Sequence, residues 1–219
     1  MRDFGHFFGL TFSALLPLIS PLRSTFLFEG LVGGSPGTVY RTLAHKIAIN
    51  TAIFLLAILA MGTALLNFFG ISLPVMQVAG GFVLAAMGWS LINQGESDKS
   101  DVEIVVDSAQ LESLKQKVFY PLTFPITVGP GGIVVMVTLS AHVSTKGTLP
   151  TIAAYTGIVT AVLFLSVAVY VCYGYAPAIM ARVSPQTVNG IVRVLAFVLL
   201  CIGVQIMWTG VQGLLKTLS

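Results

Sequence analysis

Six long apolar stretches, separated mostly by short connections, dominate the hydrophobic pattern of this chain. Each is long enough for an α-helix to cross the hydrocarbon core of a bilayer, which takes about 20 residues. The stretches are residues 7–32, 44–68, 73–92, 118–141, 149–175 and 188–215. The pattern therefore predicts an all-α integral membrane protein with six transmembrane helices.

One polar segment interrupts this pattern between the third and fourth stretches. Residues 95–117 carry six of the eight acidic residues of the chain, together with three lysines. We interpret this segment as an acidic linker between two halves, residues 1–94 and 118–219. Its second part fits a short helix in the membrane interface, with Asp107 and Gln110 as a capping box. A solvated loop fits the same residues equally well.

The composition excludes several other classes of protein. Of the 219 residues, 56% are hydrophobic and 9% are charged, whereas soluble domains have about 45–50% and about 25%. A soluble or disordered chain is therefore excluded. A net charge of +3 without a basic stripe argues against nucleic-acid binding. The expected partner is the lipid bilayer, and the formation of homo-oligomers is left open.

The distribution of Lys and Arg predicts the orientation of the chain. Six spans place both termini on one side of the membrane. That side has three basic residues, namely Arg2, Lys146 and Lys216. The other side has seven, namely Arg41, Lys46, Lys99, Lys115, Lys117, Arg182 and Arg193. Because basic residues are enriched on the cytoplasmic side, we expect the linker in the cytoplasm and both termini outside.

The first and fourth stretches share a Pro-Leu-x-x-Pro motif. The prolines are Pro17 and Pro21 in the first copy, and Pro121 and Pro125 in the second. A proline removes a backbone hydrogen bond and clashes with the preceding turn, so two of them four residues apart are expected to break a helix. A Gly-Pro-Gly-Gly run with Pro130 follows the second copy. The alternative for either motif alone is a packing kink, because proline is common in membrane helices.

The recurrence of the motif at the start of each half indicates an internal repeat. Gly88 and Gly95, in and just after the third stretch, also match Gly203 and Gly210 in the second half at one constant spacing. Each half has three helices, so two homologous halves have opposite orientations in the membrane. Inverted repeats of this kind are common in secondary transporters, in which one half rocks against the other around a central site.

Two helix breaks that meet near the membrane midplane would form a small polar site. Freed backbone groups cannot face lipid, while helix N-termini favour anions and exposed carbonyls favour cations. A zwitterionic amino acid would fit such a site. The candidate binding residues are Ser20, Arg23, Thr25, Thr123, Thr127, Gly129, Gly131 and Gly132, and the residues expected to hold the breaks open are Pro17, Pro21, Pro121, Pro125 and Pro130.

Arg23 lies inside the first apolar stretch, two residues beyond Pro21. A charge in hydrocarbon is costly and needs a partner, and Glu29 is the one acid in that stretch. Two interpretations stay open. Arg23 could attract the carboxylate of a solute, or it could extend to the headgroups at the cytoplasmic interface.

No motif in the sequence supports enzymatic chemistry. Cys172 and Cys201 lie in apolar stretches without a CxxC motif, and the three histidines are too scattered for a metal site. A P-loop, a GxGxxG motif, an HExxH motif and a nucleophile–base set are absent from the sequence. We therefore expect that the protein is not an enzyme and that it uses no cofactor or metal.

The segments around the two proline motifs resemble the MarC family of six-span bacterial membrane proteins. The resemblance is carried by residues 15–22, 69–74, 78–81, 119–131 and 203–205. Among these, residues 119–131 hold the central Pro-Leu-x-x-Pro-x-x-x-Gly-Pro-Gly motif, and the similarity extends over nearly the whole chain. The resemblance implies a protein of the bacterial inner membrane, related to transporters of small neutral amino acids, some of which are exporters.

These patterns favour a secondary transporter of a small polar solute, with efflux of small neutral amino acids as the substrate hypothesis. One alternative is a lipid-handling protein, either a flippase or a binder of anionic lipids. Another is a membrane scaffold that transports nothing and recruits partners through the acidic linker.

Overall fold

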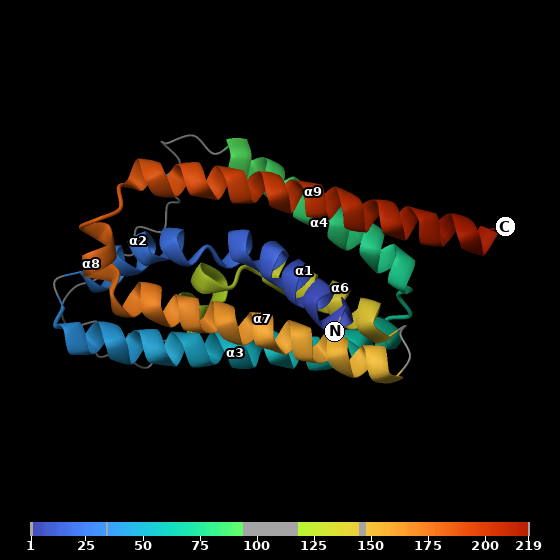
Figure 1. The fold of residues 1–219 in the computed structure, drawn as a ribbon, viewed down its shortest axis with the longest axis horizontal. Coiled ribbons are helices and arrows are strands. Elements are labelled where there is room, and N and C mark those ends of the chain that lie inside the picture. Colours follow the sequence, from blue (N-terminus) through green and yellow to red (C-terminus); the bar gives the residue numbers. More distant parts are fainter. Residues whose placement is uncertain (1, 34, 94–117, 145–147, 219) are drawn as a thin grey trace.

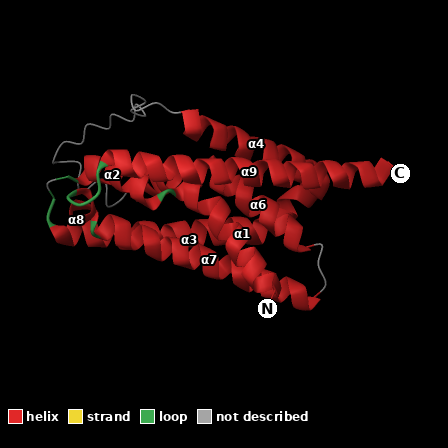
Figure 2. Cartoon of the chain, turned by 45° about the horizontal axis from the view of Figure 1, so that its top comes forward, coloured by secondary structure: helices red, strands yellow, loops and turns green. Residues whose placement is uncertain are grey.

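The computed structural model describes residues 2–33, 35–93, 118–144 and 148–218, and all regular elements in these residues are helices (Figure 1, Figure 2). The elements are α1 (Arg2–Ile19), α2 (Pro21–Val32), α3 (Gly37–Phe68), α4 (Leu73–Asn93), the π-helical η2 (Val118–Thr127), α6 (Pro130–Ser144), α7 (Thr148–Gly174), α8 (Ala176–Met180) and α9 (Pro185–Leu218). The linker expected at residues 95–117 lies outside the described residues.

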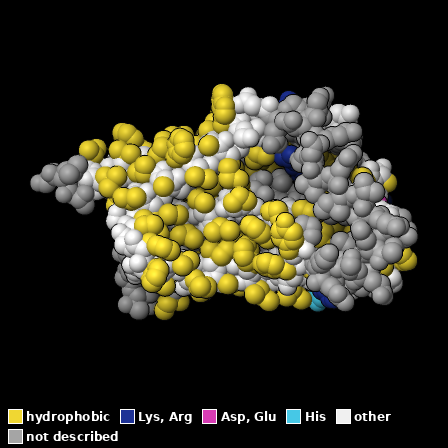
Figure 3. Space-filling model, turned by 180° about the vertical axis from the view of Figure 1, so that it is seen from behind, with side chains coloured by type: hydrophobic (Ala, Val, Ile, Leu, Met, Phe, Trp, Pro, Cys, Tyr) yellow, Lys and Arg dark blue, Asp and Glu magenta, His cyan; other side chains and the backbone are white. Residues whose placement is uncertain are grey.

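The lengths of the helices fit six membrane spans. Five segments are long and apolar enough to cross a bilayer, and a sixth span results when the bent pair η2–α6 is counted as one. α1 and α2 together make the first span, Asp3–Gly30. Apolar side chains cover the middle of the face seen in Figure 3, as contact with lipid tails requires. The prediction of an all-α integral membrane protein is confirmed.

The helices form three layers, with the two broken helices in the middle layer (Figure 1). α4 packs against α9 on one side, and α3 packs against α7 on the other side. The broken helices α1–α2 and η2–α6 lie between these two pairs and contact both. Each layer therefore contains one helix from each half of the chain.

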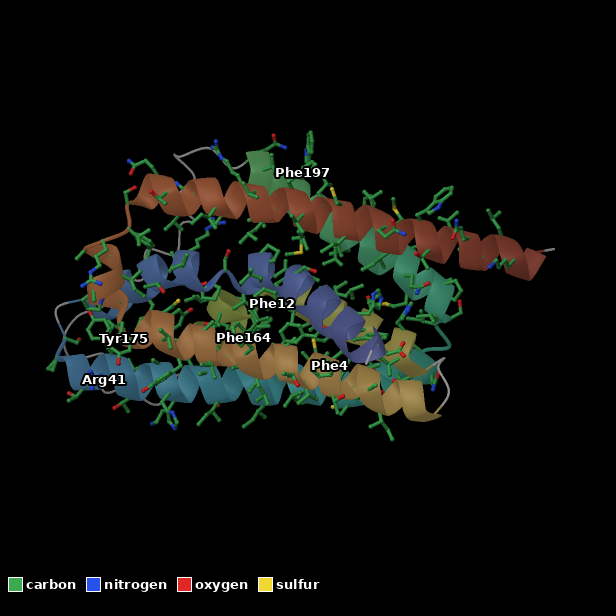
Figure 4. The ribbon with its side chains drawn as sticks, viewed as in Figure 1. Phe4, Phe12, Arg41, Phe164, Tyr175 and Phe197 are labelled. Carbon is green, nitrogen blue, oxygen red and sulfur yellow. The ribbon has the colours of Figure 1, made fainter. Side chains whose placement is uncertain are left out.

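The helices α3 and α7 run antiparallel to each other. The Arg41 guanidinium, near the start of α3, lies 5.6 Å from the ring centroid of Tyr175, which directly follows α7 (Figure 4). One turn further along α3, His45 contacts Tyr170, with 6.1 Å between the ring centroids. Residues later in α3 therefore contact residues earlier in α7, as in any antiparallel pair.

The two broken helices are also antiparallel. The ring of Phe7 in α1 lies 5.8 Å from the ring of His142 near the end of α6. Further along α1, Leu18 lies against Gly131 at the start of α6. Spans that stand three apart in an up-and-down bundle run in opposite directions, as the two halves of an inverted repeat would.

Glycines allow the backbones of α4 and α9 to touch. A Cβ atom on Gly81 would lie 2.6 Å from the carbonyl oxygen of Gly203, and a Cβ atom on Gly203 would lie 2.8 Å from the carbonyl oxygen of Gly81. A real Cβ atom does not approach a backbone oxygen so closely. Small residues at a membrane helix interface commonly serve this close packing, and we call the two residues the central glycine pair.

Contacts on both sides of the central glycine pair define the register between the halves. An added Cβ on Gly88 would lie 2.8 Å from the carbonyl oxygen of Ala196, and one on Gly210 would lie 2.7 Å from that of Pro74. Gly88 and Gly210 are 122 positions apart in the sequence. The same spacing separates Pro74 from Ala196 and Gly81 from Gly203. The sequence match of Gly88 with Gly203 is therefore shifted by one heptad from the register in the structure.

The central glycine pair predicts a large stability effect from one methyl group. We expect Gly203→Ala to lower the free energy of unfolding by about 1–3 kcal/mol, because the α4 and α9 backbones must move apart. In the matched control Gly190→Ala, also in α9, the added Cβ meets nothing within 4 Å, and helix propensity favours alanine there. Thermal unfolding of the two variants in detergent measures the difference. Equal midpoints would contradict the close packing of α4 against α9.

Candidate functional site

The first helix breaks at Ser20, directly before Pro21. α1 continues through Pro17 to Ile19, and α2 begins at Pro21. Ser20 has φ 39° and ψ 65°, in the left-handed region, which residues with a side chain rarely adopt. Proline disfavours the right-handed helical conformation in the residue before it, and this explains the position of the break. The first motif therefore gives one break, and Pro17 is accommodated inside a continuous helix.

The second span is interrupted more extensively than the first. Tyr120 and Phe124, each directly before a proline, have extended backbones with φ −120° and −125°. Gly129 lies between η2 and α6, and α6 begins at Pro130, where the missing N–H leaves no hydrogen bond unmade. The two helices meet at an angle of 75°. Both breaks thus lie near the middle of their spans, which is where the sequence motifs predicted them.

The candidate threonines are buried and bonded to their own helices. Thr25, Thr123 and Thr127 have no exposed surface. Each hydroxyl donates a hydrogen bond to a carbonyl oxygen four or five residues earlier, at distances of 2.7–3.1 Å. These bonds satisfy carbonyls next to the breaks, and each hydroxyl oxygen retains the capacity to accept another hydrogen bond.

Tyr173 of α7 links the two breaks and was not identified from the sequence. Its ring is completely buried and stacks on Phe28 of α2, with the ring centroids 4.6 Å apart. The Tyr173 hydroxyl lies 2.9 Å from the Thr127 hydroxyl of the second break, so this side chain touches both broken helices. A tyrosine inside an apolar stretch signals that its hydroxyl needs a partner, but sequence alone does not name a partner on another helix.

The glycines of the second break pack against neighbouring side chains. A Cβ atom on Gly131 would lie 2.7 Å from the Met87 sulfur and 2.9 Å from a methyl group of Leu18. On Gly132 it would lie 2.8 Å from a methyl group of Val128. Gly131 therefore brings the start of α6 into contact with both α1 and α4, and a larger residue there would press on flexible side chains rather than on backbone.

Charged side chains are sparse around the breaks. Arg23 is half-buried on α2. Glu29 lies on the same unbroken helix six residues later, so the two side chains leave α2 in different directions. The Glu29 carboxylate lies near the Tyr40 hydroxyl. Among the described residues, no group of three or more His, Cys, Asp or Glu side chains is arranged to hold a metal ion.

A cavity of about 320 Å³ lies against the first break. The break forms one wall, α7 forms a second and the first part of α9 forms a third. The lining consists of Leu16, Ser20, Pro21, Leu22, Ala168, Cys172, Val188, Ile191, Val192 and Leu195. Apart from the Ser20 hydroxyl and the Cys172 thiol, these side chains are apolar. The cavity therefore contains only one of the candidate binding residues, Ser20.

The sequence profile of the MarC family of integral membrane proteins matches residues 5–215. The chain belongs to the MarC family. It is 30% identical to the inner membrane protein MarC of Salmonella arizonae, with 99% of both chains covered. The MarC proteins of Salmonella typhimurium and Escherichia coli O157:H7 are 29% and 27% identical over the same share of each chain. No solved structure matches. Like these relatives, this MarC family member is a protein of the bacterial inner membrane.

The link between the two breaks predicts a specific effect of removing one hydroxyl. Tyr173→Phe removes the hydroxyl that hydrogen-bonds to Thr127, and we expect a loss of about 1–2 kcal/mol in the free energy of unfolding. Tyr175→Phe makes the same chemical change at an exposed ring two residues later and is expected to alter stability by less than about 0.5 kcal/mol. Thermal unfolding in detergent compares the two. A Tyr173→Phe midpoint equal to that of Tyr175→Phe would contradict the link.

Proposed function

We propose that this MarC family protein is a secondary transporter of a small polar solute, with efflux of small neutral amino acids as the substrate hypothesis. The supporting observation is the pair of broken helices between two pairs of unbroken helices. Irregular backbone at membrane depth is tolerated where it is buried in protein or lines a cavity, and it is typical of transporter sites. A protein that needs only to be anchored in the membrane has no use for two such breaks.

The candidate residues take different parts in this proposal. Arg23 attracts a carboxylate towards the first break, since an arginine fork matches the two oxygens of a carboxylate. Thr25 and Thr127 offer hydroxyl oxygens that accept hydrogen bonds from an ammonium group. The backbone N–H groups at the start of α6, from Gly131 onward, favour the negative end of the solute.

The three layers indicate which helices would move relative to each other during transport. Each layer holds one helix from each half, so movement of one half against the other would separate every layer. We therefore propose that the α4–α9 pair moves as a unit against the other four spans. The contacts across this boundary involve side chains, among them the Gln77 amide nitrogen 3.2 Å from a ring nitrogen of His142. Side-chain contacts can be exchanged, whereas the backbone contacts of the central glycine pair cannot.

Counterflow in proteoliposomes tests the proposed transport. Liposomes with the purified protein are loaded with unlabelled alanine, threonine and serine, and labelled alanine, threonine or serine is added outside. We expect the label to accumulate transiently, because a carrier exchanges internal for external solute. Gly131→Trp should reduce the accumulation at least tenfold, since the indole would displace the Met87 and Leu18 side chains that already touch this glycine. Gly190→Trp, at a glycine without neighbours within 4 Å, should transport normally.

Absence of counterflow from folded protein with all three amino acids would remove the amino-acid hypothesis. The apolar lining of the cavity would then favour the lipid-handling alternative. Fluorescent phospholipid in the same liposomes, quenched from outside by dithionite, measures the flip rate between the leaflets. A rate equal to that of protein-free liposomes contradicts a flippase.

The proposed orientation has the acidic linker in the cytoplasm and both termini outside. The N- and C-termini lie towards the same end of the helices in Figure 1, as an even number of spans requires. Alkaline phosphatase fused after Ser219 should be active, because it folds only outside the cytoplasm. Green fluorescent protein at the same position should be dark. The opposite result would reverse the orientation.

A further inference from the structure

The cavity at the first break is bounded by helices that do not pack directly on each other. Ala168 and Cys172 line it from α7, and Val188 and Ile191 line it from α9. In the described part of the chain, α7 and α9 make no extended contact; the first break lies at the base of the space between them. All the lining residues belong to membrane spans, and Ile191 is 42% exposed. An opening beside Ile191 would connect the cavity with the lipid that surrounds the helices.

The lining of this cavity contains one hydroxyl that has no partner. Ser20 is 8% exposed, and its Oγ makes no hydrogen bond. Nearby hydroxyls differ, because Ser24 donates to the Ile19 carbonyl at 2.9 Å and Thr25 donates to the Pro21 carbonyl at 2.7 Å. Because Ser20 has a left-handed backbone, its hydroxyl is not placed as in a regular helix, where the carbonyl oxygens of the preceding turn serve as acceptors. A buried hydroxyl without a partner is destabilising, and a ligand that hydrogen-bonds to it recovers that loss.

We propose that this cavity binds a lipophilic molecule that has a compact apolar body and one hydrogen-bonding group, and that the molecule enters from the bilayer. The cavity volume is about 320 Å³, roughly twice that of the ~150 Å³ engineered cavity that binds benzene. A body the size of two fused aromatic rings therefore fits. The hydrogen-bonding group pairs with Ser20 Oγ. This oxygen has almost no accessible surface and no hydrogen bond holds it in place, so it turns towards the cavity when the ligand binds. This site does not depend on the transport proposed above.

The lining selects against other occupants. A zwitterion or an ion would lose its hydration in a cavity without a charged side chain in its lining, and that loss is large. A saturated acyl chain matches the apolar walls but leaves the Ser20 hydroxyl without a partner. The hydroxyl therefore distinguishes a ligand with a polar group at this depth from a lipid tail that only fills space.

Equilibrium binding of 2-naphthol tests the proposal, with naphthalene as the matched probe that lacks the hydroxyl. The protein is placed in lipid nanodiscs, and nanodiscs without protein give the background from partitioning. We expect saturable binding of 2-naphthol, about fivefold tighter than that of naphthalene, as one net hydrogen bond provides. Ser20→Ala should remove the difference between the two probes. Ser20→Gly should do the same with a residue that tolerates the positive φ.

The two cysteines of the chain locate the bound probe. Cys172 lines the cavity, and Cys201 is exposed on α9. In the Cys201→Ser variant, 2-naphthol should slow the reaction of Cys172 with N-ethylmaleimide. In the Cys172→Ser variant, it should leave the reaction of Cys201 unchanged. Slowing of both reactions alike would mean that the probe acts through the bilayer and would contradict the site.

A cavity-filling variant provides a second test that needs no cysteine chemistry. Ala168→Phe places a ring in the cavity and should abolish saturable binding of 2-naphthol. Val194→Phe adds a ring at a position of α9 that is 66% exposed and should leave binding unchanged. The proposal is overturned if folded protein shows no saturable binding, or if Ala168→Phe binds as well as Val194→Phe. Equal affinity for both probes, unaffected by Ser20→Ala, would indicate a cavity for lipid tails instead.

Discussion

The backbone of a protein in hydrocarbon must find all of its hydrogen bonds within the protein, and the arrangement of this chain follows from that requirement. Regular helices satisfy it by themselves, so α3, α4, α7 and α9 can face lipid over most of their length. The two broken helices cannot, because residues such as Ser20 and Phe124 interrupt their hydrogen-bond ladders. Both broken helices accordingly lie between the two unbroken pairs, where side chains such as Tyr173 bond to the residues around the breaks.

The two outer helix pairs are held together by different kinds of contact. α4 and α9 bring backbone against backbone at the central glycine pair, a contact that gains from dispersion forces and leaves little freedom to slide. α3 and α7 meet through larger side chains, including the Arg41–Tyr175 and His45–Tyr170 contacts. The broken helices therefore lie between one pair held by backbone contacts and one pair held by side-chain contacts.

Much of this fold was predictable from sequence because hydrophobicity and proline act locally. The six apolar stretches and the position of the second break follow from residues within one turn of each feature. Other features depend on distant contacts. Gly81, Gly88 and Gly95 recur every seven residues, so a glycine match alone cannot choose the register, and only the contact between helices does so. In the same way, the Tyr173 side chain contacts two helices far away in the chain, through its ring and through its hydroxyl, and three parts of the chain line the cavity.

The central glycine pair also bears on how such a chain could arise. Two equivalent glycines that face each other reproduce the contact of a symmetric homodimer, in which one surface meets its own copy. A three-helix precursor that inserted into the membrane in both orientations would have formed this contact between separate subunits. Duplication and fusion, with a polar segment joining the copies, would then have made the partnership permanent. Divergence after such a fusion would account for the single break of one half and the double interruption of the other.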